Sequence, residues 1–200
     1  MTQAITKPKL TYQDYLTYDD GTDSRYELVD GELVAMNPPR AKHSQVGRFL
    51  YQVLDDAITR TGESWIVCWD YGVRTGVKQS RIPDLTVITE AQEDSLIESD
   101  SEAVLEEPPI LAIEIVSPND RTTDYRYKRS EYAVKGIPEY WIVDPRNNRI
   151  TVLTLVDGFY EEAIFEGNDP IISGTFPHLN LAASQVLSPK KPSGNINAVR

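Results

Sequence analysis

Two acidic residues stand inside segments that otherwise have the composition of buried β-strands. Asp84 follows a proline in the apolar segment 82–88, and Glu114 lies in the nearly continuous apolar run 109–116. A buried carboxylate without a partner is costly or takes up a proton, so something must compensate both charges. If the two strands are neighbours, one cation can serve both acids. The alternative is a pair of half-exposed acids at the edge of a sheet.

Oxygen ligands of this kind indicate which cation to expect. Carboxylates suit hard ions such as Mg²⁺, with Mn²⁺ as a substitute, and these ions keep several waters and accept phosphate oxygens. Downstream, Asp124, Lys128 and Tyr132 recur every fourth residue and so project from one helix face. Lys128 can therefore reach back toward such a cation, although an ordinary helix ion pair with Asp124 explains the same spacing.

The elements that must position these residues follow from hydrophobic periodicity and turn residues. Asp30-Gly31 between two short apolar runs indicates a tight β-hairpin, and Gly62 closes a segment with apolar residues at helical spacing. The predicted helices span 10–16, 43–61 and 123–135, and the predicted strands span 26–29, 32–36, 64–73, 82–88, 109–116, 139–145, 149–155 and 161–165. This order predicts an α/β domain with a mixed β-sheet flanked by α-helices and with additional N-terminal and C-terminal hairpins.

Length and charge set further bounds. The 200 residues suit a single domain, expected at 1–187, followed by a disordered tail at 188–200 that lacks apolar periodicity. The formal net charge of −11 opposes loose, charge-driven binding to nucleic acid. Much of the excess lies in segment 90–107, which holds eight acids and no lysine or arginine. We expect this segment to be a solvated loop.

Several function classes are excluded by what the chain lacks. One cysteine, Cys68, and two histidines leave no disulfide framework and no cysteine or histidine zinc site. The sequence also holds no nucleophile elbow, no phosphate-binding P-loop and no zinc-deaminase motif. Nothing resembles a signal peptide, and no apolar stretch approaches the roughly 18 residues of a membrane span, so we expect a cytoplasmic protein without a membrane partner.

Five stretches of the sequence share one resemblance. They are Tyr26-Glu27-Leu28-Val29-Asp30-Gly31-Glu32, His43, 81–85, 112–118 and 136–145. Together they resemble the Uma family of putative restriction endonucleases, in the PD-(D/E)XK nuclease superfamily, over the chain from Leu10 to Leu187. The resemblance implies a restriction-endonuclease-like α/β core. The superfamily signature expects lysine where this chain has Val116, and the resemblance implies Lys128 as the replacement.

The resulting hypothesis is a metal-dependent endonuclease that hydrolyses phosphodiester bonds of nucleic acid, with DNA as the expected polymer. The expected catalytic residues are Asp84, Glu114 and Lys128, and the implied Mg²⁺ ligands are Asp84, Glu114, the Ile115 carbonyl and Glu27. Glu27 falls on a motif position, and an exposed hairpin acid is the alternative reading. Lys128 would orient the water or stabilise charge on the phosphate. The roles of His43, Asp124 and Tyr132 stay open.

Two other functions also stay open. A nuclease fold that no longer cuts would serve as a binding module for nucleic acid or protein, which Val116 and the net charge favour. A hydrolase of small phosphoesters or nucleotides would meet less difficulty from an acidic surface. Basic residues near the site either touch phosphates or form a solvated face: Arg121, Arg126, Arg129, Lys135, Arg146 and Arg149. We expect a homodimer, with the strand at 149–155 as an exposed edge.

Overall fold

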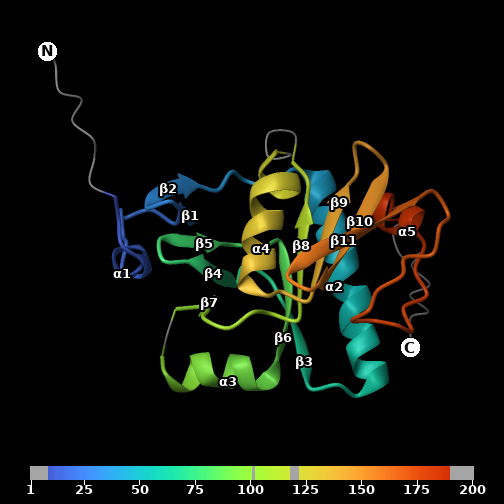
Figure 1. The fold of residues 1–200 in the computed structure, drawn as a ribbon, viewed down its shortest axis with the longest axis horizontal. Helices are drawn as coiled ribbons and strands as arrows, with labels where there is room; N and C mark the ends of the chain where they lie inside the picture. Colours follow the sequence, from blue (N-terminus) through green and yellow to red (C-terminus); the bar gives the residue numbers. More distant parts are fainter. Residues whose placement is uncertain (1–8, 101, 118–121, 190–200) are drawn as a thin grey trace, which may run out of the picture.

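Two β-sheets form the framework, with helices packed around them (Figure 1). The computed structural model describes residues 9–100, 102–117 and 122–189. In chain order the elements are α1 (Tyr12–Leu16), β1 (Tyr26–Val29), β2 (Glu32–Ala35), α2 (Ala41–Thr61), β3 (Trp65–Cys68), β4 (Gly72–Gly76), β5 (Gln79–Arg81), β6 (Leu85–Thr89), α3 (Glu90–Glu98), β7 (Val104–Leu105), β8 (Leu111–Ile115), the π-helix η1 (Thr123–Lys128), α4 (Arg129–Lys135), β9 (Glu139–Asp144), β10 (Arg149–Val156), β11 (Phe159–Glu166) and α5 (Ala183–Leu187). The five-stranded sheet has the order β2-β1-β5-β4-β7, and the six-stranded sheet has the order β11-β10-β9-β8-β6-β3. The strands predicted for one sheet therefore divide between two.

The six-stranded sheet is mixed, as predicted, because β8 and β9 are parallel whereas its other neighbours are antiparallel. The connection between β8 and β9 carries η1 and α4, which lie on one face, while α2 lies on the other (Figure 1). Ile113 and Ile115 pack in the core with α2, and Ala112 and Val116 pack in the core with α4. Burial on both faces explains the nearly continuous apolar run of β8. Glu114 points to the α4 face.

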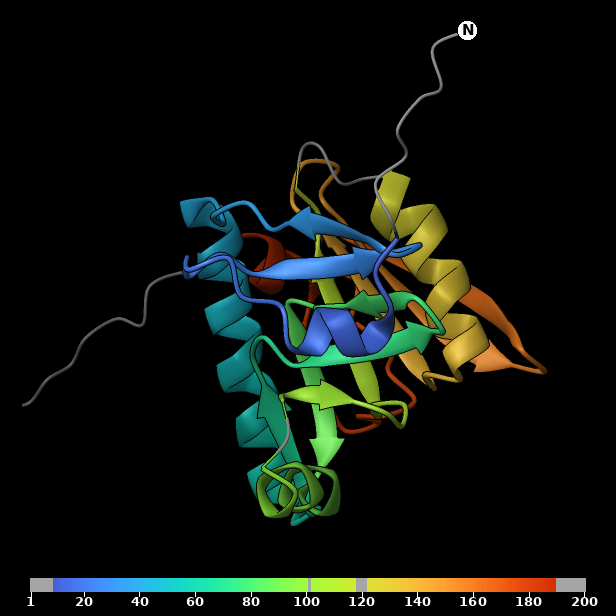
Figure 2. The same ribbon diagram turned by 90° about the vertical axis from the view of Figure 1, so that its left-hand side faces the viewer.

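The five-stranded sheet lies between the same two helices. Figure 2 shows it toward the viewer, with α1 in front and with α2 and α4 on either side. β1 and β2 form its outer hairpin, and β5 pairs antiparallel with β1. Leu28 of β1 and Val73 of β4 are fully buried, so this sheet also contributes to the core.

Local signals in the first third of the chain are confirmed. Thr11 caps α1 through a reciprocal capping box with Asp14. Asp30 and Gly31 have φ angles of 49° and 79°, the positive values that the tight β1–β2 turn requires. α2 ends at Gly62, which has a φ of 71° in the left-handed region that glycine adopts most easily.

Two segments predicted as single strands change sheet instead. Segment 64–73 divides into β3 and β4, which belong to different sheets, and Asp70 between them has a φ of 63°. Segment 82–88 begins outside any strand, because β5 ends at Arg81 and β6 begins at Leu85. Pro83 lies between them and cannot donate to a ladder. Asp84 therefore lies where the chain passes from one sheet to the other.

The acidic segment is more regular than the predicted solvated loop. It forms α3 and β7, and α3 begins with a capping box between Thr89 and Gln92. The acids of its first turn, Glu90 and Glu93, interact favourably with the positive end of the helix dipole. No residue of α3 is buried, so this helix is solvated, but Leu105 of β7 is buried and the prediction of a loop is wrong.

The C-terminal third differs from prediction at the sheet edge. β10, expected as an exposed edge, pairs with β9 on one side and β11 on the other, so β11 is the edge strand. Residues 190–200 of the predicted tail lie outside the described residues. Pro189, which was predicted to belong to that tail, is buried, and its carbonyl accepts a hydrogen bond from Gln45. Across the part of the chain that the structure describes, no helix is long and apolar enough to cross a membrane.

Candidate active site

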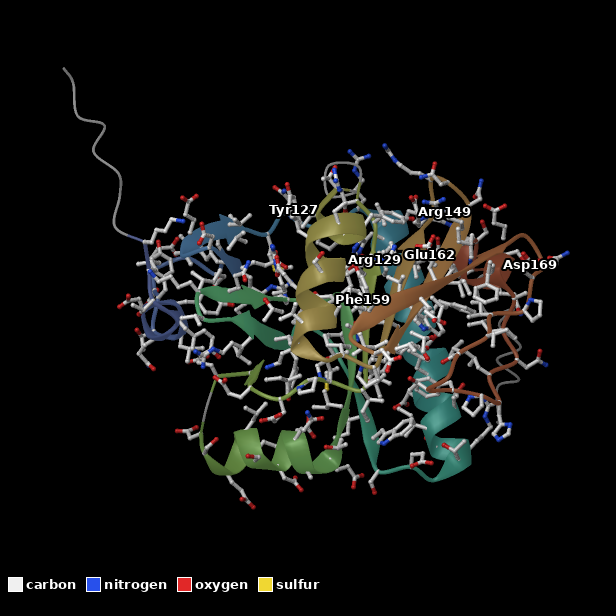
Figure 3. The ribbon with its side chains drawn as sticks, in the orientation of Figure 1. Tyr127, Arg129, Arg149, Phe159, Glu162 and Asp169 are labelled. Carbon is white, nitrogen blue, oxygen red and sulfur yellow. The ribbon has the colours of Figure 1, made fainter. Side chains whose placement is uncertain are left out.

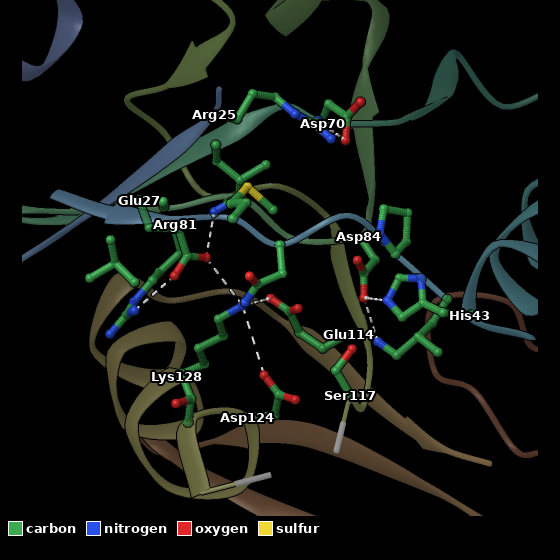
Figure 4. Close-up of a pocket in the computed structure, with 18 of the residues that line it drawn as sticks. Arg25, Glu27, His43, Asp70, Arg81, Asp84, Glu114, Ser117, Asp124 and Lys128 are labelled. Carbon is green, nitrogen blue, oxygen red and sulfur yellow. Dashed lines mark hydrogen bonds and ion pairs between the residues drawn. The ribbon is translucent and has the colours of Figure 1, made fainter. Parts of the chain in front are cut away.

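One cavity brings together the side chains that the sequence singled out. Its volume is about 760 Å³, and its wall includes Glu27, Asp84, Glu114, Ile115 and Lys128. These residues come from both sheets and from η1. Figure 4 shows the three acids and the lysine converging on the same space.

Asp84 is held by the backbone of the neighbouring strand. Its Oδ2 accepts a hydrogen bond of 2.6 Å from the Ile115 N–H and lies 3.0 Å from Nε2 of His43. β6 and β8 are antiparallel neighbours, with Leu85 opposite Ile113, so the predicted adjacency of the two acidic strands is confirmed. Among the described residues, the second oxygen of Asp84, Oδ1, has no hydrogen-bond partner.

His43, whose role the sequence left open, lies in the first turn of α2 and also lines the cavity. Burial lowers the pKa of its imidazole, but the hydrogen bond to Asp84 and the charge of that carboxylate outweigh burial, so the pKa is raised. The protonated ring donates to a carboxylate, which is a charge-assisted hydrogen bond. His43 therefore supports Asp84 from the helix side.

Glu114 is buried within the sheet with 4% of its surface exposed, so its reading as a half-exposed edge acid is wrong. Its Oε1 accepts hydrogen bonds from Lys128 Nζ at 2.7 Å and from the Tyr132 hydroxyl at 2.8 Å. Burial raises the pKa of Glu114 well above its usual range; the charge of Lys128 opposes the shift, and Asp124 and Asp84 add to it. Within the described part of the chain, Oε2 of Glu114 has no protein donor, and the residue faces the cavity.

Lys128 supplies the positive charge beside Glu114. Its Nζ lies 2.7 Å from Glu114 Oε1, 3.2 Å from Glu27 Oε1 and 3.8 Å from Asp124 Oδ1. Burial by itself lowers the pKa of this amine, but the three carboxylates outweigh burial and raise the pKa above its usual value. Lys128 therefore stays cationic. η1 is a π-helix, a form that recurs at functional sites, and it presents both Asp124 and Lys128 to the interior.

Glu27 is engaged by protein groups on both carboxylate oxygens. Oε2 accepts a hydrogen bond from Arg81 Nη1 at 2.9 Å, and Oε1 lies 3.1 Å from the Ile82 N–H donor and 3.2 Å from Lys128 Nζ. Burial raises the pKa of Glu27, but the charges of Lys128 and Arg81 outweigh burial and lower the pKa. Glu27 is 7% exposed, so the alternative of an exposed hairpin acid is wrong.

Arg81 and Glu131 are site residues that the sequence reasoning missed. Nη2 and Nε of Arg81 donate to the two oxygens of Glu131 at 2.6 and 2.7 Å, a bidentate pair, and both residues line the cavity. Arg81 belongs to one of the motif stretches, but spacing along a strand does not distinguish a buried arginine from an exposed one. Its pairing with Glu27 and Glu131 depends on the packing of the five-stranded sheet against α4.

The donor set fits a hard divalent cation. The ion-paired network contains more carboxylates than cations: Glu27, Glu114, Asp124 and Glu131 against Arg81 and Lys128. As far as the described residues show, Asp84 and Glu114 each present one carboxylate oxygen without a protein donor. In residues 9–100, 102–117 and 122–189, no three His, Cys, Asp or Glu side chains stand together as a ready metal site. Mg²⁺ commonly binds through one or two carboxylates with waters and substrate phosphate, so these two acids are enough.

A sequence model of the Uma2 family, described as putative restriction endonuclease, matches residues 12–184. The chain belongs to this Uma2 family. The fold is similar to the crystal structure of a putative nuclease belonging to DUF820 from Anabaena variabilis ATCC 29413, with a TM-score of 0.75 and 18% identity over 90% of this chain and 98% of that chain. No curated protein matches the chain. The predicted family and the predicted restriction-endonuclease-like fold are confirmed.

This Uma2 chain departs from the superfamily signature at Val116, where lysine is expected. Val116 is 7% exposed and packs in the same core cluster as Tyr132 and Ile142. An ammonium group nevertheless contacts Glu114, because Lys128 reaches it from η1. Lys128 of η1 thus makes the contact with Glu114 that the signature assigns to a lysine at position 116 of the strand.

The basic residues expected near the site of this Uma2 chain lie elsewhere. Arg129 pairs with Glu162 at 2.6 Å, and Arg149 donates to the hydroxyl of Tyr125 (Figure 3). None of the described members of that set lines the cavity, and Arg121 lies outside the described residues. The arginines on the cavity wall are Arg25, Arg40 and Arg81.

Proposed function

We propose that this chain is a metal-dependent endonuclease that hydrolyses phosphodiester bonds of nucleic acid, with DNA as the expected polymer. The family and the nuclease fold support the reaction class. The observation that carries the proposal is the buried contact of Lys128 with Glu114 beside Asp84, with one oxygen of each acid left to the cavity. Buried charges are costly unless they are paired, and an acid in a cavity whose pKa is raised, as that of Glu114 is, is typical of functional sites.

The proposed cation is Mg²⁺, with Mn²⁺ as a substitute, and its ligands would be Asp84, Glu114 and the Ile115 carbonyl. A bound ion of this class polarises a phosphate and lowers the pKa of a water. Glu27 was also expected as a ligand, but protein donors engage both of its oxygens. We therefore assign Glu27 to holding Lys128 in place.

Lys128 acts as a cation rather than as a base in this proposal. Its carboxylate partners raise its pKa, so the amine has no lone pair to accept a proton near neutral pH. An ammonium at this place donates a hydrogen bond to the phosphate or the water and stabilises the negative charge that develops in the transition state. Tyr132 keeps its proton as well, because burial and the charge of Glu114 raise the pKa of the phenol. Its hydroxyl therefore fixes the Glu114 carboxylate.

A hydrolase of small phosphoesters or nucleotides is the second candidate. The net charge of −11 opposes binding of a polyanion, and a cavity of about 760 Å³ has the size of a small-molecule site. The binding module that no longer cuts is favoured by the net charge alone. The valine at position 116 is no longer an argument for an inactive binding module, because Lys128 supplies the contact with Glu114.

Cleavage assays separate the three functions. Purified protein is incubated with plasmid, single-stranded DNA and nucleotide esters in Mg²⁺, Mn²⁺ or EDTA. We expect metal-dependent cutting of polymer that falls about 100-fold or more in Asp84→Asn and Glu114→Gln. The matched control Glu98→Gln changes an exposed acid of α3 and should cut like the wild type. Activity on nucleotide esters alone selects the small-substrate hydrolase, and a folded protein that cuts nothing selects the binding module.

A homodimer is part of the same proposal. β11 is an edge strand of the six-stranded sheet, and Phe159 on it is 79% exposed (Figure 3). Edge strands with exposed apolar side chains favour pairing with another chain. Light scattering measures the mass directly. A dimeric wild type and a monomeric Phe159→Glu variant support the proposal, and a monomeric wild type contradicts it.

A further inference from the structure

Trp69 is a large aromatic side chain exposed on the wall of the active-site cavity. Of the three tryptophans in the sequence, Trp141 is fully buried and Trp65 is partly buried against Phe176, whereas Trp69 is 39% exposed. Trp69 lines the same cavity as Asp84 and the other charged residues of the site. An exposed indole has no role in the proposed chemistry, so its placement calls for another explanation.

One face of α2 joins Trp69 to the acidic residues. His43, Gly47 and Tyr51 are spaced every fourth residue and so lie along one side of the helix. His43 contacts Asp84, a Cβ on Gly47 would stand 2.8 Å from Cη2 of Trp69, and the Tyr51 ring stacks on the indole with centroids 5.7 Å apart. The indole therefore lies one to two helical turns, about 6–12 Å along the axis, from the histidine that holds Asp84.

The position of the indole is fixed from several sides. Glycine inside a helix is less favourable than alanine, and here it leaves the space that the indole occupies. The ring of Tyr51 lies within 12° of parallel to the indole. The next residue along the chain, Asp70, has a φ of 63° and forms an ion pair with Arg25 across the cavity mouth (Figure 4). Trp69 and Asp70 are therefore both held by contacts with other parts of the chain.

We infer that Trp69 is a stacking platform for an unpaired nucleobase next to the phosphate to be cut, so that the site takes single-stranded nucleic acid in preference to duplex. A flat apolar ring beside phosphate-handling groups is how proteins bind single strands, and stacking accepts every base because each has a π-face. Bases within a duplex are already covered by their neighbours. Stacking does not depend on charge, so it can offset part of the repulsion between the phosphates and a chain with a net charge of −11.

This inference rests on the proposed function for the nature of the reaction, but the stacking can be measured without turnover. Intrinsic fluorescence is recorded in EDTA and in Ca²⁺ while a single strand of about 12 nucleotides is added, and a gel confirms that the strand stays intact. We expect quenching by the single strand, and much weaker binding of the matching duplex. Trp69→Leu should weaken binding of the single strand about 5- to 150-fold.

A strand of equal length with abasic sugars at every position completes a double-mutant cycle. It keeps the phosphates and removes the bases, so it should bind the wild type as weakly as Trp69→Leu binds the normal strand. The two changes together should cost little more than either alone, because both remove the same contact. Trp69→Phe keeps a ring and should recover part of the affinity. Tyr18→Leu removes an exposed ring that does not line the cavity and should bind like the wild type.

Several results overturn the inference. Wild-type affinity in a folded Trp69→Leu variant, equal binding of the abasic strand, or equal binding of the duplex each contradicts stacking on an unpaired base. If a free nucleoside monophosphate binds as tightly as the single strand, the inference that the site takes a polymer is contradicted. Base-dependent binding without any cutting supports the stacking role of Trp69 and contradicts the proposed nuclease function. Metal-dependent cutting that is the same in the wild type and in Trp69→Leu supports the nuclease function and contradicts the stacking role. A ribose strand that quenches as well as DNA supports the inference, because the base is the shared element.

Discussion

Replacing Lys128 by methionine removes the charge that holds three buried carboxylates together and keeps most of the apolar stem. Glu27 would retain its contacts with Arg81 and the Ile82 N–H, whereas Glu114 would keep only the Tyr132 hydroxyl among the donors of the described residues. The loss therefore falls mainly on Glu114, whose Oε1 lies 2.7 Å from the ammonium. The side chains of both partners are less than a tenth exposed, so solvent screening reduces the effect little.

The expected magnitude is that of breaking a buried ion pair by removing one partner, about 3–5 kcal/mol of unfolding free energy. Uptake of a proton by Glu114 limits this loss at low pH. Burial already raises the pKa of Glu114 in the folded protein, and loss of the opposing charge of Lys128 raises it further. The folded variant therefore binds this proton more readily than the unfolded chain does. Its stability must fall as the pH rises from the unfolded pKa through the folded pKa.

Urea unfolding in EDTA measures this effect at about pH 8 and about pH 5.5. We expect Lys128→Met to lose about 3–5 kcal/mol at the higher pH and distinctly less at the lower. Lys42→Met, which changes an exposed lysine of α2, should stay within about 0.5 kcal/mol of the wild type. A loss below about 1 kcal/mol at the higher pH would show that Lys128 does not compensate the buried acids. Under the proposed function, the same variant should lose turnover more than it loses affinity for Mg²⁺.

Three further changes test the surroundings of the site. Tyr132→Phe leaves Glu114 with one donor fewer and should lose about 1–3 kcal/mol in urea unfolding, whereas Tyr127→Phe, at a residue 61% exposed, should lose almost nothing. Gly47→Ala forces the Trp69 indole to move and should be destabilising by about 1 kcal/mol despite better helix propensity; an unchanged acrylamide quenching profile would argue against the contact. Burial raises the pKa of the Cys68 thiol to about 12, so at about pH 8 iodoacetamide should modify the native protein far more slowly than the unfolded chain, and equal rates would contradict the burial.

The features that could be predicted from the sequence are those that a few neighbouring residues determine. Asp30-Gly31 specifies a tight turn wherever the hairpin packs, and Gly62 ends a helix by its own backbone freedom. Asp84 and Glu114 could be found because a carboxylate in an apolar run breaks a local pattern. The predicted helix face was also local information: Lys128 and the residues four before and after it are all buried.

The features that could not be predicted from the sequence depend mostly on the pairing of strands that lie far apart along the chain. The break between β3 and β4 and the break at Pro83 are changes of sheet, and a strand pattern looks the same whichever sheet it joins. α3 is a different case, because its capping box from Thr89 to Gln92 was a readable signal that the acidic composition obscured. Trp69 could not be recognised either, since an apolar residue next to a strand is indistinguishable from core until the cavity is known.

The division of the strands between two sheets explains why the site needs so many ion pairs. Glu27 and Arg81 belong to the five-stranded sheet, Glu114 belongs to the six-stranded sheet, and Lys128 lies on the connection that leaves it. A site divided in this way has no single sheet to support all of its residues. The contact of Lys128 with both Glu27 and Glu114 links the two sheets at the cavity. The network therefore couples the packing of the sheets to the position of the ammonium group. Under the proposed function, a change of Glu27 on β1 should consequently reduce turnover as well as stability.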